Sequence, residues 1–506
     1  MSQSIKTLLI WFAIQSLSHL AMAQGDGFFR VYERPDRDFY GVTAIETRDG
    51  NLIVAMYDGI GAGEMALLSR DGMMIRRVQI SDTGIRSGMD QLFHDPEQPD
   101  LFYGIGEILD PETENWRPYL IHFDGSLDML SRKTVELPVE YKNIRFSREV
   151  LSKNNGILFG AALDQENDYH RLYMLISFDG TVETMVETDT DASVEIRVDG
   201  LCESPVVGNY YEYRPSTNNT GNKVKRLYSF DDTFNFEFVM EYDRIDQWIA
   251  NELYSQCFLN PGESTMKTLD DSTLLFADQI WEIWRASNGS VLKTDHSMIL
   301  FSTDLAGGMK DQLVVGSKND TTDRPFHFNA LAITNGRLDG ERLVYSGCYG
   351  YFYPPRPNHI TLTKTDCHLN ALWQRSYSYQ NKYLTATYLM DTNDGGCVVV
   401  GNADEDLHCD PFVLKVNPDG WVGSDEIRVE SRLMYYPNPV GEVLQLQCSP
   451  DITIEQVELY DMLGRRVLTQ DTGNERIGMG GLPAGPYTLR VILNDGTTFT
   501  DKVVKQ

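Results

Sequence analysis

The chain has 506 residues, of which 74 are Asp or Glu and 44 are Lys or Arg, so its formal net charge is −30. This acidic balance excludes nucleic acid as an expected partner, because phosphate binding needs Lys and Arg to displace counterions. Beyond the first residues, no stretch approaches the roughly 18 apolar residues of a membrane span. We therefore expect a soluble mature chain without a transmembrane span.

The first 23 residues have the pattern of a secretory signal peptide. Lys6 gives a basic start, residues 8–14 give an apolar stretch, and residues 21–23 form a small-x-small cleavage site before Gln24. Because Gln24 is not a cysteine, no lipid anchor is expected at the cut. A buried N-terminal strand is the alternative, but the period-two alternation of a half-buried strand is absent.

A short apolar strand that ends in Asp, usually followed by Gly, recurs seven times. The aspartates are Asp71, Asp124, Asp179, Asp231, Asp304, Asp366 and Asp419. Several copies follow a second strand opened by Asp-Gly or Asn-Gly, as at Gly50, Gly156 and Gly395, where glycine reaches positive φ without steric cost. Each repeat therefore indicates several short antiparallel strands joined by turns.

One such sheet cannot bury both of its faces, whereas sheets repeated around an axis can, and a period of roughly 40 to 50 residues is typical of propeller blades. We predict an all-β fold, with a seven-bladed β-propeller over residues 24–430 and a small immunoglobulin-like β-sandwich over residues 431–506. Residues 28–32 are expected to pair with the last repeat and close the ring, which removes open sheet edges. The last repeat, at residues 391–420, resembles the propeller-like repeats of many secreted bacterial proteins. This resemblance implies architecture and no chemistry.

The longest spacing, between Asp231 and Asp304, contains apolar residues at helical spacing. They are Ile245, Trp248, Ile249 and Leu253. We predict an inserted helix that packs its apolar stripe on a blade, with a functional lid as the alternative.

Seven cysteines, all after residue 200, do not form a dense disulfide framework. Cys397 with Cys409, and Cys348 with Cys367, are candidates for cross-strand disulfides. The odd count leaves at least one free thiol, for which Cys448 is the candidate.

After about residue 431 the repeats stop, and short strand-like runs separated by Gly, Pro, Asn and Asp favour a small antiparallel sandwich. The motifs in this module are Tyr-Pro-Asn-Pro at 436–439, Leu-Gly-Arg at 463–465, Ala-Gly-Pro-Tyr at 484–487 and Lys-Val-Val-Lys at 502–505. Each motif alone could be a linker or a turn. In this order they resemble the type A sorting domain of type IX secretion, with one departure at Pro486, where the family usually has a strand residue.

The resemblance implies delivery to the periplasm of a Gram-negative cell and passage through the outer membrane to the cell surface or the medium. It also implies removal of the module and attachment to surface polysaccharide, with the type IX secretion machinery as partner. The sorting-signal residues that it implies are Pro437, Asn438, Pro439, Gly464, Arg465, Gly485, Tyr487, Lys502 and Lys505.

The sequence contains no nucleophile elbow, zinc-protease, phosphate-loop or dinucleotide motif. No catalytic, cofactor-binding or metal-ligating residue is therefore predicted, and no cofactor is expected. Two aromatic segments, at 209–222 and 348–359, combine rigid rings with adaptable polar groups that suit contact with protein or sugar. The candidate ligand-binding residues are Tyr349, Tyr351, Phe352, Tyr353, Tyr211 and Tyr213. Packing of these rings against the blades is the alternative.

The expected function is binding or scaffolding outside the cell, with a glycan, a peptide or an envelope protein as ligand, because a propeller holds loops from all blades around one channel mouth. A polysaccharide hydrolase or lyase is the alternative, since its carboxylates would come from different blades and leave no local motif. Two buried carboxylates about 5 to 9 Å apart in the cleft would favour the enzyme. An aromatic, poorly charged rim would favour binding.

Overall fold

A computed structural model of the chain divides into two compact units, Met1–Ile427 and Arg428–Gln506, and each is considered by itself. The residues that it describes are 27–33, 38–58, 62–80, 85–113, 115–138, 141, 144–152, 156–165, 168–189, 200–217, 223–242, 256–259, 264–285, 291–315, 322–326, 329–334, 342–351, 358–380, 382–405, 408–422, 433–436, 440–448, 453–461, 465–471, 476–493 and 498–505. The predicted signal peptide and the predicted inserted helix lie outside these residues.

The first unit is all-β and consists of about seven four-stranded antiparallel sheets, an arrangement consistent with a propeller. Three of the sheets are β2 (Phe39–Glu46), β3 (Leu52–Asp58), β4 (Gly63–Leu68) and β5 (Met74–Gln79); β6 (Ser87–His94), β7 (Leu101–Leu109), β8 (Trp116–Asp124) and β9 (Met129–Thr134); and β10 (Ile144–Ser152), β11 (Gly156–Gln165), β12 (Asp168–Ser177) and β13 (Val182–Asp189). The next sheet is β14 (Gly200–Glu203), β15 (Asn209–Thr217), β16 (Lys223–Asp231) and β17 (Glu237–Tyr242).

One larger sheet of ten strands contains two further four-stranded groups. The groups are β19 (Thr265–Asp270), β20 (Thr273–Arg285), β21 (Val291–Asp304) and β22 (Met309–Val315), and then β24 (Leu331–Thr334), β25 (Leu343–Tyr351), β26 (Ile360–Thr365) and β27 (Ala371–Tyr377). The short strands β18 (Gln256–Leu259) and β23 (Thr322–Pro325) complete it. Because β20 and β21 run past the ends of their own group, β18 pairs with β20, and β23 links β21 to β25.

The last sheet joins the two ends of the first unit. It contains β28 (Tyr383–Asp391), β29 (Cys397–Glu405), β30 (His408–Val416) and, at its outer edge, the N-terminal strand β1 (Phe28–Val31). Phe28 pairs with Lys415 and Val31 with Phe412 in an antiparallel ladder. The predicted pairing of the N-terminal segment with the last repeat is therefore confirmed.

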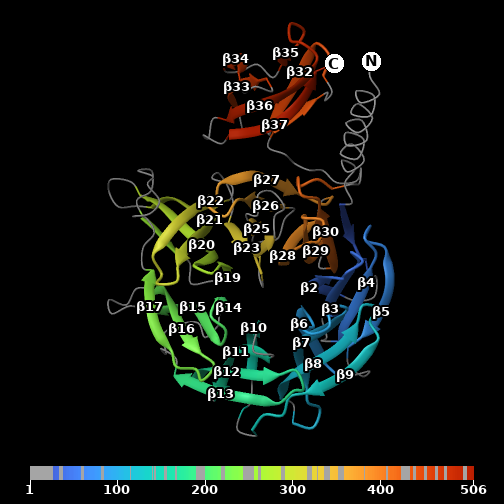
Figure 1. The fold of residues 1–506 in the computed structure, drawn as a ribbon, viewed down its shortest axis with the longest axis vertical. Helices are drawn as coiled ribbons and strands as arrows, with labels where there is room; N and C mark the ends of the chain where they lie inside the picture. The colour runs from blue at the N-terminus through green and yellow to red at the C-terminus, as the bar shows by residue number, and fades with distance from the viewer. Residues whose placement is uncertain are drawn as a thin grey trace, which may run out of the picture. The chain divides into compact units, whose positions relative to one another are not determined.

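The sheets follow one another in chain order around a central space (Figure 1). The first strand of each group contacts the first strand of the next, and β28 contacts β2. Apolar clusters fill the space between neighbouring sheets; one contains Ile53 from β3 and Phe102 from β7. In another cluster, Phe276 of β20 and Phe301 of β21 stack with ring centroids 4.5 Å apart.

Seven equivalent turns follow the third strands of these groups. In each turn the N–H of the fourth residue donates to the carbonyl of the first, and the fourth residue has a φ between 57° and 86°. The fourth residues are Gly72, Leu127, Gly180, Phe234, Gly307, Leu369 and Gly420. The three that are not glycine have buried side chains, so packing holds them in a conformation that L-residues avoid.

The repeated aspartates of the sequence belong to these turns, which confirms that each marks the end of a strand; in every group this is the third strand. They do not occupy one position, however: Asp124 is the first residue of its turn, whereas Asp71 is the third residue of a turn that begins with Ser69. Asp124 Oδ1 accepts the N–H groups of Ser126 and Asp128. Asp or Asn in the first position thus satisfies turn donors, which is a structural role.

The second unit contains two small sheets on one apolar core. The first sheet is β31 (Leu433–Tyr436), β32 (Val443–Cys448) and β35 (Arg476–Gly478), and the second is β34 (Arg466–Asp471), β33 (Ile454–Tyr460), β36 (Gly485–Leu493) and β37 (Thr498–Lys505). Leu444 from the first sheet and Leu489 from the second are both fully buried in this core. Pro486 is accommodated in β36, where it pairs with Val504 of β37.

The predicted disulfides are wrong. Cys397, Cys409, Cys348 and Cys367 are all free thiols. Cys397 pairs with Val416 and Cys409 with Asp404, so these two cysteines lie toward opposite ends of the β29–β30 ladder. Sequence proximity to a shared hairpin is not enough for a disulfide, which needs Cα atoms about 4.4 to 6.8 Å apart. In the described part of the chain, no helix is long and apolar enough to cross a membrane.

Candidate functional site

The N-terminal strand β1 borders a groove of about 360 Å³ in the first unit. Its lining residues, which define the closure groove, are Phe28, Phe29, Arg30, Val31, Tyr32, Gly72, Met73, Met74 and Tyr379. They come from three separate parts of the chain: β1, the turn between β4 and β5, and the segment after β27. The groove volume falls within the range of ordinary ligand pockets, about 300 to 1,000 Å³.

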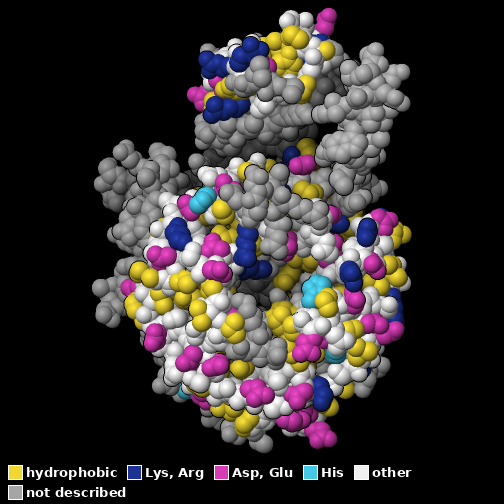
Figure 2. Space-filling model, in the orientation of Figure 1, with side chains coloured by type: hydrophobic (Ala, Val, Ile, Leu, Met, Phe, Trp, Pro, Cys, Tyr) yellow, Lys and Arg dark blue, Asp and Glu magenta, His cyan; other side chains and the backbone are white. Residues whose placement is uncertain are grey.

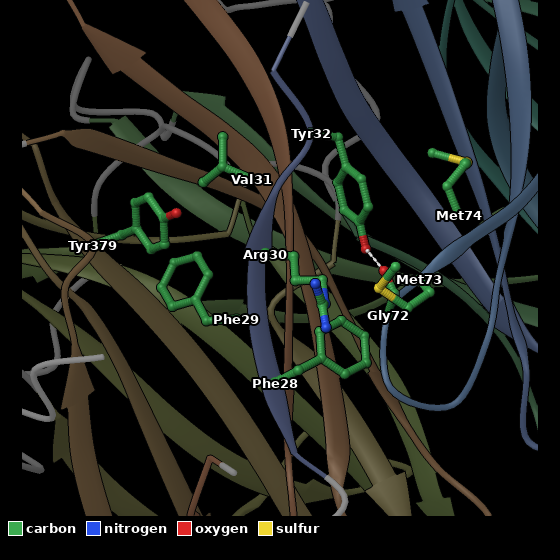
Figure 3. A pocket seen from close by; sticks show the side chains of 9 residues that line it. All are labelled: Phe28, Phe29, Arg30, Val31, Tyr32, Gly72, Met73, Met74 and Tyr379. Carbon is green, nitrogen blue, oxygen red and sulfur yellow. Dashed lines mark hydrogen bonds between the residues drawn. The ribbon is translucent and has the colours of Figure 1, made fainter. Parts of the chain in front are cut away.

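The groove has two walls, one on each side of β1 (Figure 3). On one side Tyr32 Oη donates a hydrogen bond to the Gly72 carbonyl at 2.9 Å, and Met73 lies beside this contact with 53% of its surface exposed. On the other side Phe29 lies next to Tyr379, with ring centroids 5.0 Å apart. Aromatic and thioether groups of this kind suit stacking and adaptable apolar contact.

Few charges face the groove. Arg30 Nε donates to the carbonyl oxygen of Asp71 at 2.9 Å, so the single cation of the lining is already engaged. A hydrogen bond from Ser69 lowers the pKa of Asp71. The Asp71 carboxylate therefore stays ionised near the Arg30 guanidinium. Burial raises the pKa of Tyr32, so its hydroxyl stays neutral and remains a donor. The lining is thus aromatic and nearly uncharged.

The centre of the ring is the second place where polar groups converge. Figure 2 shows Lys and Arg side chains at the central hollow, whereas Asp and Glu are scattered over the surrounding face. Gln91 of β6 donates through Nε2 to Tyr388 Oη of β28 at 3.1 Å, although the sheet of β2 stands between their two sheets. On β19, burial lowers the pKa of Lys267, and the nearby charge of Asp391 opposes this shift.

Asp90 is the most perturbed carboxyl group of this region. The register of β6 against β7 shifts between Met89 and Gln91, which makes Asp90 the extra residue of a β-bulge. Burial raises the pKa of Asp90 from its ordinary value of 3.8 to about 7. Its Oδ2 atom is buried, and it has no hydrogen-bond partner among the residues described. The bulge therefore holds a carboxyl group whose charged form is disfavoured by burial.

The predicted ligand-binding tyrosines that the structure describes lie in the interior. Tyr349 is 4% exposed, Tyr211 8% and Tyr213 0%. Tyr213 Oη donates to Asp278 Oδ2 at 2.9 Å, which satisfies it inside the protein. The side chain of Tyr351 and the whole of Phe352 and Tyr353 lie outside the described residues. A ligand-binding role for these two segments stays a prediction.

The sorting-signal residues are distributed over the second unit. Arg465 is exposed and forms an ion pair with Asp461 at 2.7 Å, whereas Tyr487 is buried and its hydroxyl donates to the Pro483 carbonyl at 2.8 Å. Gly485 opens β36 at a φ of 151° and pairs with Lys505. Lys502 pairs with Thr488. Pro437, Asn438, Pro439 and Gly464 lie outside the described residues.

Comparison with known proteins identifies the second unit. Residues 434–506 match the family described as the secretion system C-terminal sorting domain. The chain is therefore a type IX-secreted protein with a propeller-like first unit, exported across the outer membrane to the surface or the medium, and its sorting domain implies interaction with the type IX machinery. No curated protein matches the chain.

Three solved structures are similar at low identity. A crystal structure of polysaccharide lyase Uly1 has 8% identity, covers 79% of this chain and 93% of its own, and has a TM-score of 0.45. The α-L-arabinofuranosidase Arb93A from Fusarium graminearum has 10% identity, coverage of 78% and 97%, and a TM-score of 0.38. The β-propeller domain of the trilobed protease from Pyrococcus furiosus has 9% identity, coverage of 67% and 96%, and a TM-score of 0.26.

The closure groove was not predicted as a site from the sequence. Phe28 and Tyr32 were expected only as members of a closing strand, and nothing near Tyr379 or Met73 in the sequence indicates a pocket. The groove exists because ring closure brings the N-terminus against residues more than 340 positions away, as in the Phe29–Leu414 pair. A cluster of aromatic residues in the strand that closes a repeat ring is the one available signal.

Proposed function

We propose that the protein is an extracellular binding module whose closure groove takes the ligand, a peptide or a glycan, while the second unit serves export. The observation that carries this proposal is the lining: four aromatic rings and two methionines around a space of about 360 Å³, with one engaged cation. A poorly charged aromatic surface favours contact and recognition over proton transfer.

The finer architecture belongs to the same proposal. Residues 24–430 form a seven-bladed β-propeller closed by β1, and residues 431–506 form an immunoglobulin-like sandwich. Support comes from the cyclic contacts of the first strands and from the two sheets on one core in the second unit. A closed ring holds the groove on rigid sheets, and this rigidity lowers the ordering cost of binding.

Two matched substitutions test the groove. Met73 lies in it and is 53% exposed, whereas Ile75 is 55% exposed and is not part of the lining. The purified full-length protein is applied to peptide and glycan arrays, and affinities for the best array ligand are then measured. Met73→Ala should weaken binding about fivefold or more, because truncating a buried contact side chain costs roughly 1 kcal/mol or more. Ile75→Ala should leave it unchanged. Equal changes in affinity for the two variants, or the absence of any array ligand, would contradict the proposal.

A second candidate function is polysaccharide cleavage at the centre of the ring. One observation favours it: the pKa of Asp90, raised to about 7, suits a general acid or base. Incubation of array glycans with the protein would reveal cleavage, and Asp90→Asn should then reduce the rate about 100-fold or more. If the protein cleaves no glycan, or Asp90→Asn cleaves as fast as the original chain, this candidate is excluded.

A further inference from the structure

The groove contains main-chain groups as well as side chains, because β1 is the outermost strand of its sheet. Tyr32 N–H donates to the Pro411 carbonyl of the neighbouring chain segment at 2.9 Å. In an antiparallel ladder, alternate residues direct both N–H and C=O toward the same side. Tyr32, Arg30 and Phe28 therefore face β30, and Phe29 and Val31 direct their backbone groups to the free edge.

β1 and β27 each carry one charged residue, Arg30 and Arg375, whereas the other outermost strands of the first unit carry two or more. β5 carries Arg76 and Arg77 on its exposed positions, and β9 carries Arg132 and Lys133. Charged residues on an edge strand prevent pairing with another chain. In β1 the single charged residue is Arg30, which is tied to Asp71 across the blade boundary. No described strand pairs with the outer edge of β1, so among these residues the edge is open to main-chain pairing.

We propose that the closure groove binds an extended polypeptide segment, which adds to β1 as a further strand. This inference rests on the proposed function and names its ligand class. The N–H and C=O of Phe29 and Val31 pair with the main chain of the segment, and its alternate side chains enter the two walls, one at Phe29 and Tyr379 and the other at Met73. Strand addition uses main-chain bonds for affinity and side-chain pockets for specificity.

The chemistry of the groove defines the segment. Its nearly uncharged lining favours apolar or aromatic residues on both faces of the bound strand, since charged groups would lose hydration without a partner. Four residues of β1 and about 360 Å³ match a short segment of three to five residues better than a globular surface. A glycan would satisfy the wall side chains but would not reproduce the alternating donors and acceptors of a strand.

Removal of one edge donor tests the main-chain pairing. Val31→Pro deletes the N–H that faces the groove and leaves the N–H groups that face β30, and proline is tolerated at such edge positions. Val31→Thr keeps both the N–H and the β-branched shape, so it is the matched control. For the tightest 12-residue peptide from the array, Val31→Pro should weaken binding at least tenfold, and Val31→Thr by less than twofold. Equal affinities for the two variants would overturn the inference.

A variant-free measurement covers the case in which Val31→Pro fails to fold. The same peptide is synthesised with single N-methyl groups along its backbone. Strand addition predicts that N-methylation lowers the affinity at least tenfold at every second position of the peptide. Losses that do not alternate along the peptide would contradict it. If the arrays yield only glycans that depend on Met73, the proposed function stands and the strand inference falls. Peptide-free dimers that Val31→Pro abolishes in sedimentation would show that a second copy occupies the edge, which also overturns it.

Discussion

At the scale of single residues, the buried carboxyl group of Asp90 in the β6 bulge should make the stability of the protein depend on pH. The folded-state pKa of about 7 lies above the ordinary value of 3.8, so the unfolded chain loses this proton first as the pH rises. The contribution of Asp90 to stability should therefore be fully present below about pH 4 and be lost between pH 4 and about pH 7, by up to about 4 kcal/mol for a shift of this size.

Asp90→Asn removes this pH dependence. We expect the melting temperatures of the variant and the original chain to be similar near pH 4. The variant should be more stable by several degrees at pH 8, because the amide cannot ionise in its buried bulge. Melting curves at pH 4, 6 and 8 provide the measurement. A difference that does not change with pH would show that Asp90 does not titrate in this range.

Gly72 shows how one turn residue serves both the fold and the groove. Its φ is 78°, and a Cβ at this position would lie 2.5 Å from the ring of Phe28. Gly395 has a similar φ of 83°, but a Cβ there would meet nothing closer than Pro418 at 3.6 Å. An alanine would therefore have a strained backbone at both positions but a steric clash only at Gly72.

Gly72→Ala should therefore destabilise the protein more than Gly395→Ala, by about 1 to 3 kcal/mol, the usual cost of overpacking. Both variants carry the cost of a left-handed alanine, about 1 kcal/mol or more. Denaturant unfolding of the two variants gives the comparison. Equal losses of unfolding free energy would mean that the Phe28 ring moves aside to make room for the added methyl group.

At the scale of elements, the same contact joins successive sheets at several points of the ring. Tyr32 donates to the Gly72 carbonyl, Tyr242 to Gly307 at 3.0 Å and Tyr377 to Gly420 at 2.7 Å. Each hydroxyl belongs to the outermost strand of one sheet or to the residue directly after it. Each carbonyl belongs to the turn that follows the third strand of the next sheet. The N-terminal segment thus makes the contact of an ordinary fourth strand.

The strands were predictable where composition alternates and turns have a strong signature. The Asp-Gly turn at Gly50 and the strand that ends at Asp124 both appear as expected. The position of each aspartate within its turn was not predictable. Both Ser69 and Asp124 begin a turn of the same kind, and the sequence does not show which residue takes the first position. The closure groove was unpredictable for another reason: Phe29 and Tyr379 meet only through ring closure.

At the scale of the whole molecule, export belongs to the second unit, and the recognition that we propose belongs to the first. The second unit has its own core, with Leu444 and Leu489 fully buried, so its removal should leave the first unit folded. Deletion of residues 431–506 should trap the protein in the periplasm, because the sorting domain is lost. Surface labelling of intact cells is the test. Surface display of the truncated chain at the original level would contradict the role of this domain.

Hydrogen–deuterium exchange of the full-length protein, with and without its best array ligand, tests the binding account most directly. The closure groove predicts slower exchange in residues 28–32 and 72–74 when the ligand is bound, since these segments form the walls and the free edge. Residues 348–359 should not change. Protection confined to residues 348–359 or to the innermost strands, with residues 28–32 unaffected, would contradict the account and place recognition elsewhere on the ring.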